Sequence, residues 1–289
     1  MPPTITASNA FYYYADVEAA WQFYTEVLGM PTVADYGFAK IMRLAPTSYL
    51  TLVDAARGMH SADEPKTVTM ALVTDEVEGW YEYLTAAGVT MRSEFTPATG
   101  RPHVGFVAVD PEGYLLEFER FDPHDENTRL LPALEQLQPL YPDGSVATQR
   151  PADLGVRATV MWLYYRDTVG ANDFYTRLLG EGAIVDQGWA WAYRASPSGF
   201  LGIVDEERGL HRATDDKGVT VSFIVDDVDA WFEYVGTVDG FTFRSEEIGD
   251  ESGRVRVFVG YDPENTFLEW DTFLDVEGNE ILMPLLRRD

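Results

Sequence analysis

An internal repeat constrains this chain more than any other feature of its sequence. Residues 16–29 read DVEAAWQFYTEVLG and residues 167–180 read DTVGANDFYTRLLG, so both hold a leading acid, the triplet FYT and an apolar pair closed by Gly. Subtracting 16 from 167 gives a shift of 151 residues, and the same shift carries His60 onto His211. A repeat of this length predicts two similar domains rather than a solenoid of short units. We therefore expect any functional site to occur twice, in two versions.

The composition fits two globular domains. The chain has 289 residues, of which 46% are hydrophobic, enough for two cores in domains of about 130–150 residues each. The absence of cysteine excludes disulfides, thiolate chemistry and cysteine metal sites. No apolar run approaches the ~20 residues that span a membrane, and the segment MPPTITASNAFYYY lacks the features of a signal peptide. We therefore expect a cytoplasmic protein.

The chain is strongly acidic, with 48 acidic and 21 basic residues and a net charge of −27. Such a surface repels nucleic-acid phosphates and anionic membranes, so neither is expected as a partner. Two interpretations remain open. The acids form either a solvated coat that keeps the protein soluble or a field that gathers a cationic substrate.

Apolar periodicity divides each half of the chain into two βαβββ units. The first helix begins after Asp16 and ends at Gly29, and the second unit restarts near Lys66. Its last two strands flank the turn Asp-Pro-Glu-Gly at 110–113. The elements expected in this half are strands at 7–14, 32–36, 38–44, 48–53, 67–73, 90–95, 103–109 and 114–119, and helices after 16 and 75.

The second half repeats this order. The expected elements are strands at 157–165, 189–194, 199–204, 219–225 and 267–270, and helices after 167 and 227. The predicted organisation is a first domain at 1–121, a linker at 122–155 with a short helix near 130–137, and a second domain at 156–289 that includes a C-terminal tail. This tail, NEILMP at 279–284, repeats NTRLLP at 127–132.

Several motifs together resemble the vicinal oxygen chelate superfamily, which holds glyoxalases, bleomycin-resistance proteins and extradiol dioxygenases. They are FYTEVLG in the first helix, the restarts VTDEVEGWYEYL and VDDVDAWFEYV, and the endings DPEGYLLEFE and DPENTFLEWD. The resemblance covers nearly the whole chain, twice. It implies an α+β fold: a tandem repeat of two glyoxalase-like domains, each of two βαβββ modules that form an open, cup-shaped mixed sheet.

The resemblance also implies four positions in each cup that usually hold metal ligands. They are Asn9, Thr51, Thr69 and Glu117 in domain one, and Val160, Gly202, Thr220 and Glu269 in domain two. The family typically places His, Gln or Glu there, and only the two glutamates match. A divalent ion needs about three nitrogen or oxygen donors from the protein. We therefore expect no cofactor, while a divalent metal in domain one remains the alternative.

Glu117 and Glu269 are the candidate catalytic residues, and a shift of 152 relates them. A buried carboxylate beside aromatic rings has a raised pKa that suits proton transfer. The alternative is that both are inherited cup residues that hydrogen-bond to a neighbour or to substrate.

Strand alternation predicts which side chains line the cups, because residues two apart share a face. The ligand-binding candidates on this basis are Phe11 and Tyr13 in domain one, and Trp162, Tyr164, Trp189, Trp191 and Tyr193 in domain two, beside Glu269. Aromatic walls of this kind can stack a flat ligand or hold a cation. The alternative is that these rings fill the cups as core.

A second repeated motif, Arg57-Gly-Met-His60 and Arg208-Gly-Leu-His211, lies in the loops that join two modules. Histidine transfers protons near neutral pH, so these Arg and His residues are candidates for the rim of each cup. The alternative is that the Arg residues pair with nearby acids and the His residues satisfy loop carbonyls. His103 and His124 lack counterparts, and we expect them at the surface or in loops.

Three functions remain open. The favoured one is a glyoxalase- and bleomycin-resistance-like protein that binds a small aromatic or cationic organic molecule in a cup without a metal, as a monomer or homodimer. The alternative is a metal-dependent or carboxylate-based lyase, isomerase or dioxygenase of the same superfamily. The third is a scaffold with filled cups whose function lies on its acidic surface.

Overall fold

Four βαβββ units follow one another along the chain in the computed structural model, which describes residues 1–287. The first half holds β1 (Ile5–Tyr14), α1 (Val17–Gln22), η1 (Phe23–Val27), β2 (Thr32–Asp35), β3 (Ala39–Ala45), β4 (Ser48–Asp54), β5 (Val68–Val73), α2 (Val77–Ala86), β6 (Met91–Ser93), β7 (His103–Val109) and β8 (Leu115–Phe121). The second half holds β9 (Ala158–Tyr165), α4 (Thr168–Leu179), β10 (Val185–Asp186), β11 (Ala190–Arg194), β12 (Gly199–Asp205), β13 (Val219–Val225), α5 (Val228–Val235), β14 (Thr242–Phe243), β15 (Gly249–Glu251), β16 (Val255–Tyr261) and β17 (Phe267–Phe273). The linker holds η2 (Asp125–Asn127) and α3 (Leu130–Glu135), and the tail holds α6 (Leu282–Leu286).

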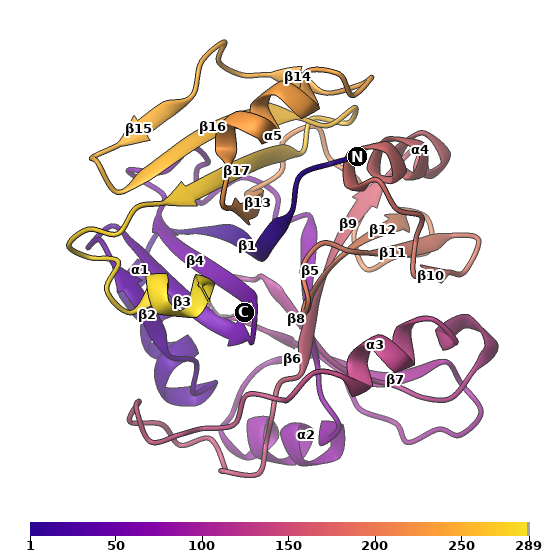
Figure 1. Ribbon diagram of the computed structural model, residues 1–289. Coiled ribbons are helices and arrows are strands. Elements are labelled where there is room, and N and C mark those ends of the chain that lie inside the picture. The colour runs from indigo at the N-terminus through magenta and orange to yellow at the C-terminus, as the bar shows by residue number, and fades with distance from the viewer. Residues whose placement is uncertain (288–289) are drawn as a thin grey trace.

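Two mixed sheets are each built from units of opposite halves of the chain. One sheet has the strand order β14-β16-β17-β13-β1-β4-β3-β2, with β15 paired to β16, and the other has the order β10-β11-β12-β9-β5-β8-β7-β6. We name them the β1/β13 sheet and the β5/β9 sheet after their central antiparallel pairs. Figure 1 shows the indigo and violet strands of the first unit beside the orange strands of the last unit. The expected α+β fold with mixed sheets is confirmed.

The sheets do not follow the division of the sequence at residues 121 and 156. Each βαβββ unit has an open edge at its first strand, and in each sheet this edge pairs with a unit from the other half. The expectation that Asn9 shares a cup with Thr69 and Glu117 is therefore wrong. Asn9 on β1 shares a sheet with Glu269 on β17, while Glu117 on β8 shares the other sheet with Val160 on β9.

One large hydrophobic core lies between the two sheets and the helices. It contains buried residues of both sheets together with Ala20 of α1, Trp80 of α2, Phe174 of α4 and Trp231 of α5. Smaller clusters lie on the opposite face of each sheet, where α3 covers part of the β5/β9 sheet and α6 covers part of the β1/β13 sheet. These faces, turned away from the main core, are the ones that carry the cups.

The two repeated motifs of each half contact one another across the sheets. Tyr24 of the first FYT triplet donates a hydrogen bond to Asp110 of the Asp-Pro turn at 3.3 Å, and Tyr175 donates to Asp262 at 3.0 Å. Burial raises the pKa of Asp110 above its ordinary value. In the first half, Tyr24 belongs to the unit that contributes to the β1/β13 sheet, and Asp110 to the unit that contributes to the β5/β9 sheet. Each half of the sequence thus ties the two sheets together.

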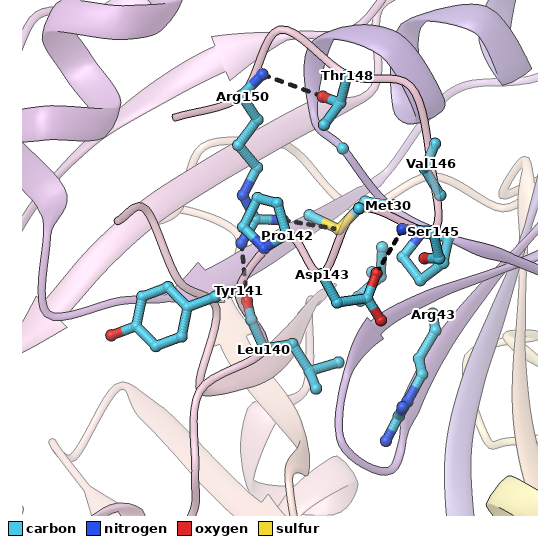
Figure 2. Close-up of a pocket in the computed structure, with 14 residues that line it drawn as sticks. Met30, Arg43, Leu140, Tyr141, Pro142, Asp143, Ser145, Val146, Thr148 and Arg150 are labelled. Atoms are coloured by element: carbon cyan, nitrogen blue, oxygen red, sulfur yellow. Dashed lines mark hydrogen bonds between the residues drawn. The ribbon is translucent and has the colours of Figure 1, made fainter. Parts of the chain in front are cut away.

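Arg150 anchors the linker to the first half of the chain. Its guanidinium donates to the backbone carbonyls of Leu28 at 3.2 Å and Leu140 at 2.7 Å, and to that of Leu154 at 2.8 Å. It lies 4.8 Å from the ring centroid of Trp80, and burial lowers its pKa to about 10. Figure 2 shows it at the edge of a cavity of about 50 Å³ beneath the linker. We interpret this cavity as a feature of the linker packing rather than as a ligand site.

The repeated tails have the same role in the two halves. Asn127 and Asn279 are fully buried, and their amides donate to the carbonyls of Asp122 and Leu274, both at 2.8 Å. This fixes the turns that place α3 and α6. Among residues 1–287 no helix is long and apolar enough to cross a membrane.

Candidate functional site

The β5/β9 sheet carries a cavity of about 190 Å³, which we name the β5/β9 cup. β8 supplies Glu117 and Glu119 to it, and β9 supplies Trp162 and Tyr164. The members of each pair are two residues apart and therefore share a face of the sheet, while the residues between them lie in the main core. Trp189 adds a further aromatic side chain. The cavity thus combines two acids with aromatic walls.

The two acids of the β5/β9 cup lie on the same face of β8, where Glu119 is buried and Glu117 is half-buried. Burial raises the pKa of Glu117 to about 7. Burial and the charge of Glu117 raise the pKa of Glu119 well above its ordinary value, and a hydrogen bond from Trp162 offsets part of this rise. Oε1 of Glu119 has no hydrogen-bond partner among the described residues. Such a pair favours a cation or a hydrogen-bond donor beside it.

The β1/β13 sheet carries a similar cavity of about 120 Å³, the β1/β13 cup. Its acids are Glu269 and Asp271 of β17 and Glu251 of β15. Ser222 on β13 donates to Oδ2 of Asp271 at 2.6 Å. Burial raises the pKa of Asp271 to about 7. Burial and the charge of Asp271 raise the pKa of Glu269 well above its ordinary value. Phe11 and Tyr13 line this cup. Both cups therefore hold a carboxyl pair.

The four family positions of the β1/β13 cup are bonded to neighbouring side chains. Asn9 Nδ2 donates to Thr51 Oγ1 at 2.9 Å, and the hydroxyls of Tyr13 and Thr220 share a hydrogen bond of 2.7 Å. Only Glu269 among the four can be an anionic ligand. Neutral hydroxyl and amide groups that already bond to each other do not fit a divalent ion.

The corresponding positions of the β5/β9 cup fit an ion no better. The Thr69 hydroxyl shares a hydrogen bond of 2.8 Å with the hydroxyl of Tyr164. Val160 and Gly202 offer no side-chain donor, and the Trp162 ring lies over Gly202 where a larger residue would place its side chain. Glu117 is the one family position in this cup with a charged ligand atom.

The aromatic wall predicted for the second domain faces Glu117 rather than Glu269. Trp162, Tyr164 and Trp189 line the β5/β9 cup, as their strand positions predict. They do not share a cavity with Glu269, because β9 and β17 belong to different sheets.

The expectation that Trp191 and Tyr193 line a cup is wrong. β11 turns Ala190 and Ala192 toward the cup side, whereas Trp191 packs against the main core. Tyr193 lies in that core and donates to the backbone carbonyl of Asn172 on α4 at 3.1 Å. Trp189 precedes β11, so alternation that starts at Trp189 does not predict which residues of the strand face the cup.

The repeated Arg-Gly-x-His motif places an arginine at each cup. The guanidinium of Arg57 lies 4.2 Å from the ring centroid of Phe38, and that of Arg208 lies 4.4 Å from the ring centroid of Trp189. Both arginines are exposed and line their cavities. Each cup thus has acids in its interior and a cation at its rim.

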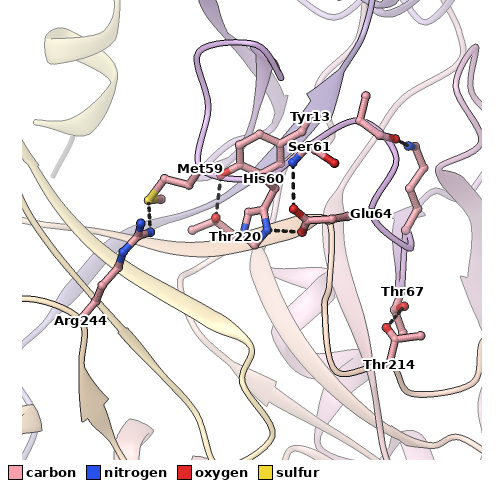
Figure 3. Close-up of polar contacts among 12 residues, drawn as sticks. Tyr13, Met59, His60, Ser61, Glu64, Thr67, Thr214, Thr220 and Arg244 are labelled. Carbon is pink, nitrogen blue, oxygen red and sulfur yellow. Dashed lines mark hydrogen bonds and ion pairs between the residues drawn. The ribbon is translucent and has the colours of Figure 1, made fainter.

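The histidines of this motif lie beside the aromatic walls rather than in the cavities. His60 meets the ring of Tyr13 edge-on at 4.8 Å and His211 meets that of Tyr164 at 5.0 Å. Figure 3 shows His60 Nδ1 directed at Glu64, whose Oε2 lies 2.6 Å away. Burial lowers the pKa of His60 and lowers that of His211 to about 4. The two imidazole rings are therefore neutral and pack against the tyrosine rings of the cup walls.

Three site residues escaped the sequence analysis: Glu119, Asp271 and His103. Glu119 and Asp271 stand two positions after the predicted glutamates, so the alternation rule that found the aromatic wall would have found them as well. His103 begins β7 opposite Phe121 of β8 and lines the β5/β9 cup. The expectation that it lies at the surface or in a loop is wrong.

Comparison with known proteins supports this description of the fold. Residues 7–118 match the family described as the Glyoxalase/Bleomycin resistance protein/Dioxygenase superfamily. No curated protein sequence matches the chain.

Two solved structures resemble almost the whole chain. Glyoxalase I from Zea mays is 16% identical over 98% of this chain and 95% of its own, with a TM-score of 0.61. A candidate dioxygenase from Bacillus subtilis is 13% identical over 94% of this chain and 86% of its own, with a TM-score of 0.65. At these identities the likeness shows the shared fold. The protein is thus a chain of the glyoxalase fold, and its residues 7–118 match the Glyoxalase/Bleomycin resistance protein/Dioxygenase superfamily.

Proposed function

We propose that the protein binds a small, flat aromatic molecule in the β5/β9 cup. The observation that carries this proposal is the position of Trp162 and Trp189 on the walls of a cavity that also contains Glu117 and Glu119. Aromatic rings stack on such walls with a preference of about 0.5–1.5 kcal/mol beyond area burial.

The size and charge of the cup narrow the ligand further. A cavity of about 150 Å³ accommodates benzene, so about 190 Å³ suits a ligand with one or two rings. The carboxyl pair favours a basic or hydrogen-bond-donating substituent in the interior. Arg208, stacked on Trp189 at the rim, favours an acceptor or an anionic group at the opposite end. Of the four family metal positions in this cup, Glu117 alone lines the cavity and takes part in this binding.

Tryptophan fluorescence tests the proposal directly. Titration with one- and two-ring aromatic amines should quench the emission of Trp162 and Trp189. Trp189→Phe should reduce the quenching and weaken binding, while Trp191→Phe on the core-facing side of β11 serves as a matched control that preserves both. A panel in which no compound quenches, or in which Trp189→Phe and Trp191→Phe behave alike, would contradict the proposal.

The β1/β13 cup supports a second candidate function, carboxylate-based proton transfer as in an isomerase or lyase. Glu269 and Asp271 face one cavity with raised pKa values, so one carboxyl can hold a proton while the other accepts one. The test is exchange of an acidic C–H of a bound compound in D₂O, followed by proton NMR. Exchange should stop in Glu269→Gln and persist in Glu117→Gln, and the reverse pattern would assign the chemistry to the other cup.

A further inference from the structure

Three metal-ligating side chains converge in the β5/β9 cup. His103 from β7 and Glu117 and Glu119 from β8 place one donor atom each within 4.8 Å of one another. His103 stands opposite Phe121 and Glu119 opposite Gly105 in the antiparallel β7–β8 pair. Gly105 lies between His103 and Glu119 on this face and adds no side chain, so the imidazole and the carboxylates can approach one another.

Two atoms of these donor groups have no hydrogen-bond partner among the described residues. Glu119 is only 2% exposed, and its Oε1 has no hydrogen bond among the residues described. Nδ1 of His103 is buried without a partner in the same part of the chain. Buried polar atoms are nearly always paired, so two such atoms in one cavity indicate a ligand for them.

In the β1/β13 cup, the acid that corresponds to Glu119 has a hydrogen-bond partner within the protein. Adding 152 to 119 gives Asp271, and subtracting 151 from 222 gives Ala71. Ser222 donates to Asp271 at 2.6 Å, whereas the equivalent Ala71 has no hydroxyl to offer Glu119. Adding 152 to 103 gives Val255, so the β1/β13 cup also lacks the imidazole. The acid with an unpaired oxygen and the extra histidine therefore occur in the same cup.

We propose that His103, Glu117 and Glu119 bind one divalent transition-metal ion, such as Zn²⁺ or Mn²⁺. One imidazole nitrogen and two carboxylates are a common donor set for these ions, and the imidazole disfavours Mg²⁺ and Ca²⁺. Two adjacent carboxylates repel each other when buried, and a divalent cation between them neutralises both charges. His103 and Glu119 lie outside the four positions at which the family usually holds its ion.

The present spacing is compatible with such an ion after a small closure. Donors of a tetrahedral ion with bonds of about 2.1 Å lie roughly 3.4 Å apart. The three side chains therefore need to close by up to about 1.4 Å from their spacing of at most 4.8 Å. The three side chains line the same cavity as Trp189, so an ion held by them would lie beside a ligand in the cup.

Isothermal titration of EDTA-treated, dialysed protein with ZnCl₂ and with MnCl₂ tests the site without any organic ligand. The expected result is one tight site per chain for at least one of the two ions. His103→Val, which copies Val255 of the other cup, should weaken that site at least about tenfold, and Glu119→Gln should do the same. Glu269→Gln, a carboxyl change in the β1/β13 cup, is the matched control and should leave it unchanged.

The outcome separates a built site from attraction of cations to the acidic surface. Weak binding of several ions that is equal in the wild type, His103→Val and Glu269→Gln would overturn the proposal, as would no binding at all. Circular dichroism of each variant confirms that it is folded. A second readout is the double variant Val255→His with Ser222→Ala, which should gain a second ion. Because no aromatic compound is present, failure here leaves the proposed aromatic binding standing.

Discussion

The ring of Trp162 lies across Gly202, its direct partner on the neighbouring strand β12. A methyl group at position 202 would overlap this ring. In the other cup the equivalent pair is Phe11 and Thr51, which are also cross-strand partners. The larger tryptophan is thus accommodated by the smallest residue, and the wall of the β5/β9 cup depends on that glycine.

Gly202→Ala should therefore displace the Trp162 ring. We expect the free energy of unfolding to fall by about 1–3 kcal/mol through overpacking, and ligand quenching of Trp162 fluorescence to decrease. Urea denaturation gives the first quantity and titration the second. Gly182→Ala is the matched control, because a methyl group there meets no atom within 4 Å. Equal stability of the two variants would show that the Trp162 ring moves at no cost.

The hydrogen bond between Ser222 and Asp271 predicts a pair of opposite effects. Ser222→Ala leaves a buried carboxyl without its donor and should lower the free energy of unfolding by about 1–3 kcal/mol. Ala71→Ser places a hydroxyl at the equivalent position beside Glu119 and should raise it by about 0.5–1.5 kcal/mol in metal-free protein. Urea denaturation at pH 7 measures both. If the two variants change the free energy of unfolding in the same direction, the two cups are not equivalent at this position.

The raised pKa of Asp271 predicts a dependence of stability on pH. The folded state holds the proton up to about pH 7, whereas the unfolded state releases it near the ordinary value of 3.8. The folded state therefore binds more protons in this window, and this group lowers the free energy of unfolding as the pH rises from about 4 to about 7. Asp271→Asn removes that loss. Its stability relative to the wild type should rise by between about 1 and 4 kcal/mol from pH 4.5 to pH 7.5.

Denaturation curves at several pH values check this prediction. Asp173→Asn changes an exposed acid on α4 and is the control for the loss of one negative charge from an acidic protein. If the stability of Asp173→Asn and that of Asp271→Asn, each relative to the wild type, rise equally with pH, net charge rather than burial of the carboxyl explains the effect.

Much of the fold and part of the site could be predicted from sequence, because they depend on local periodicity. The repeat located Glu117 and Glu269, and alternation along β9 placed Trp162 and Tyr164 correctly. The same rule failed at Trp191, because the turn before β11 shifts the parity of the strand. The same alternation places Glu119, two positions after Glu117, on the face of β8 that lines the cup. Local patterns suffice only where the strand boundaries are known.

The pairing of the units could not be predicted in this way. β1 and β5 begin similar units and present similar open edges. Judged by the sequence pattern alone, β1 could pair with β5 or with β13, and β5 could pair with β1 or with β9. The choice depends on contacts between residues far apart in the sequence. It decides which acids face which aromatic rings, and it explains why Trp162 lies with Glu117 instead of Glu269.

This pairing predicts how fragments of the chain behave. A break between Gly144 and Ser145 lies in the exposed part of the linker. It leaves β1 and β5 of fragment 1–144 each with one open edge, because their partners β13 and β9 lie in fragment 145–289. Open strand edges associate with other chains. We therefore expect neither fragment to be a folded monomer in light scattering coupled to size-exclusion chromatography. Mixing the fragments should give a 1:1 complex whose Trp189 again responds to ligand. If each fragment is a stable monomer and the two do not associate, each half of the chain closes its own cup.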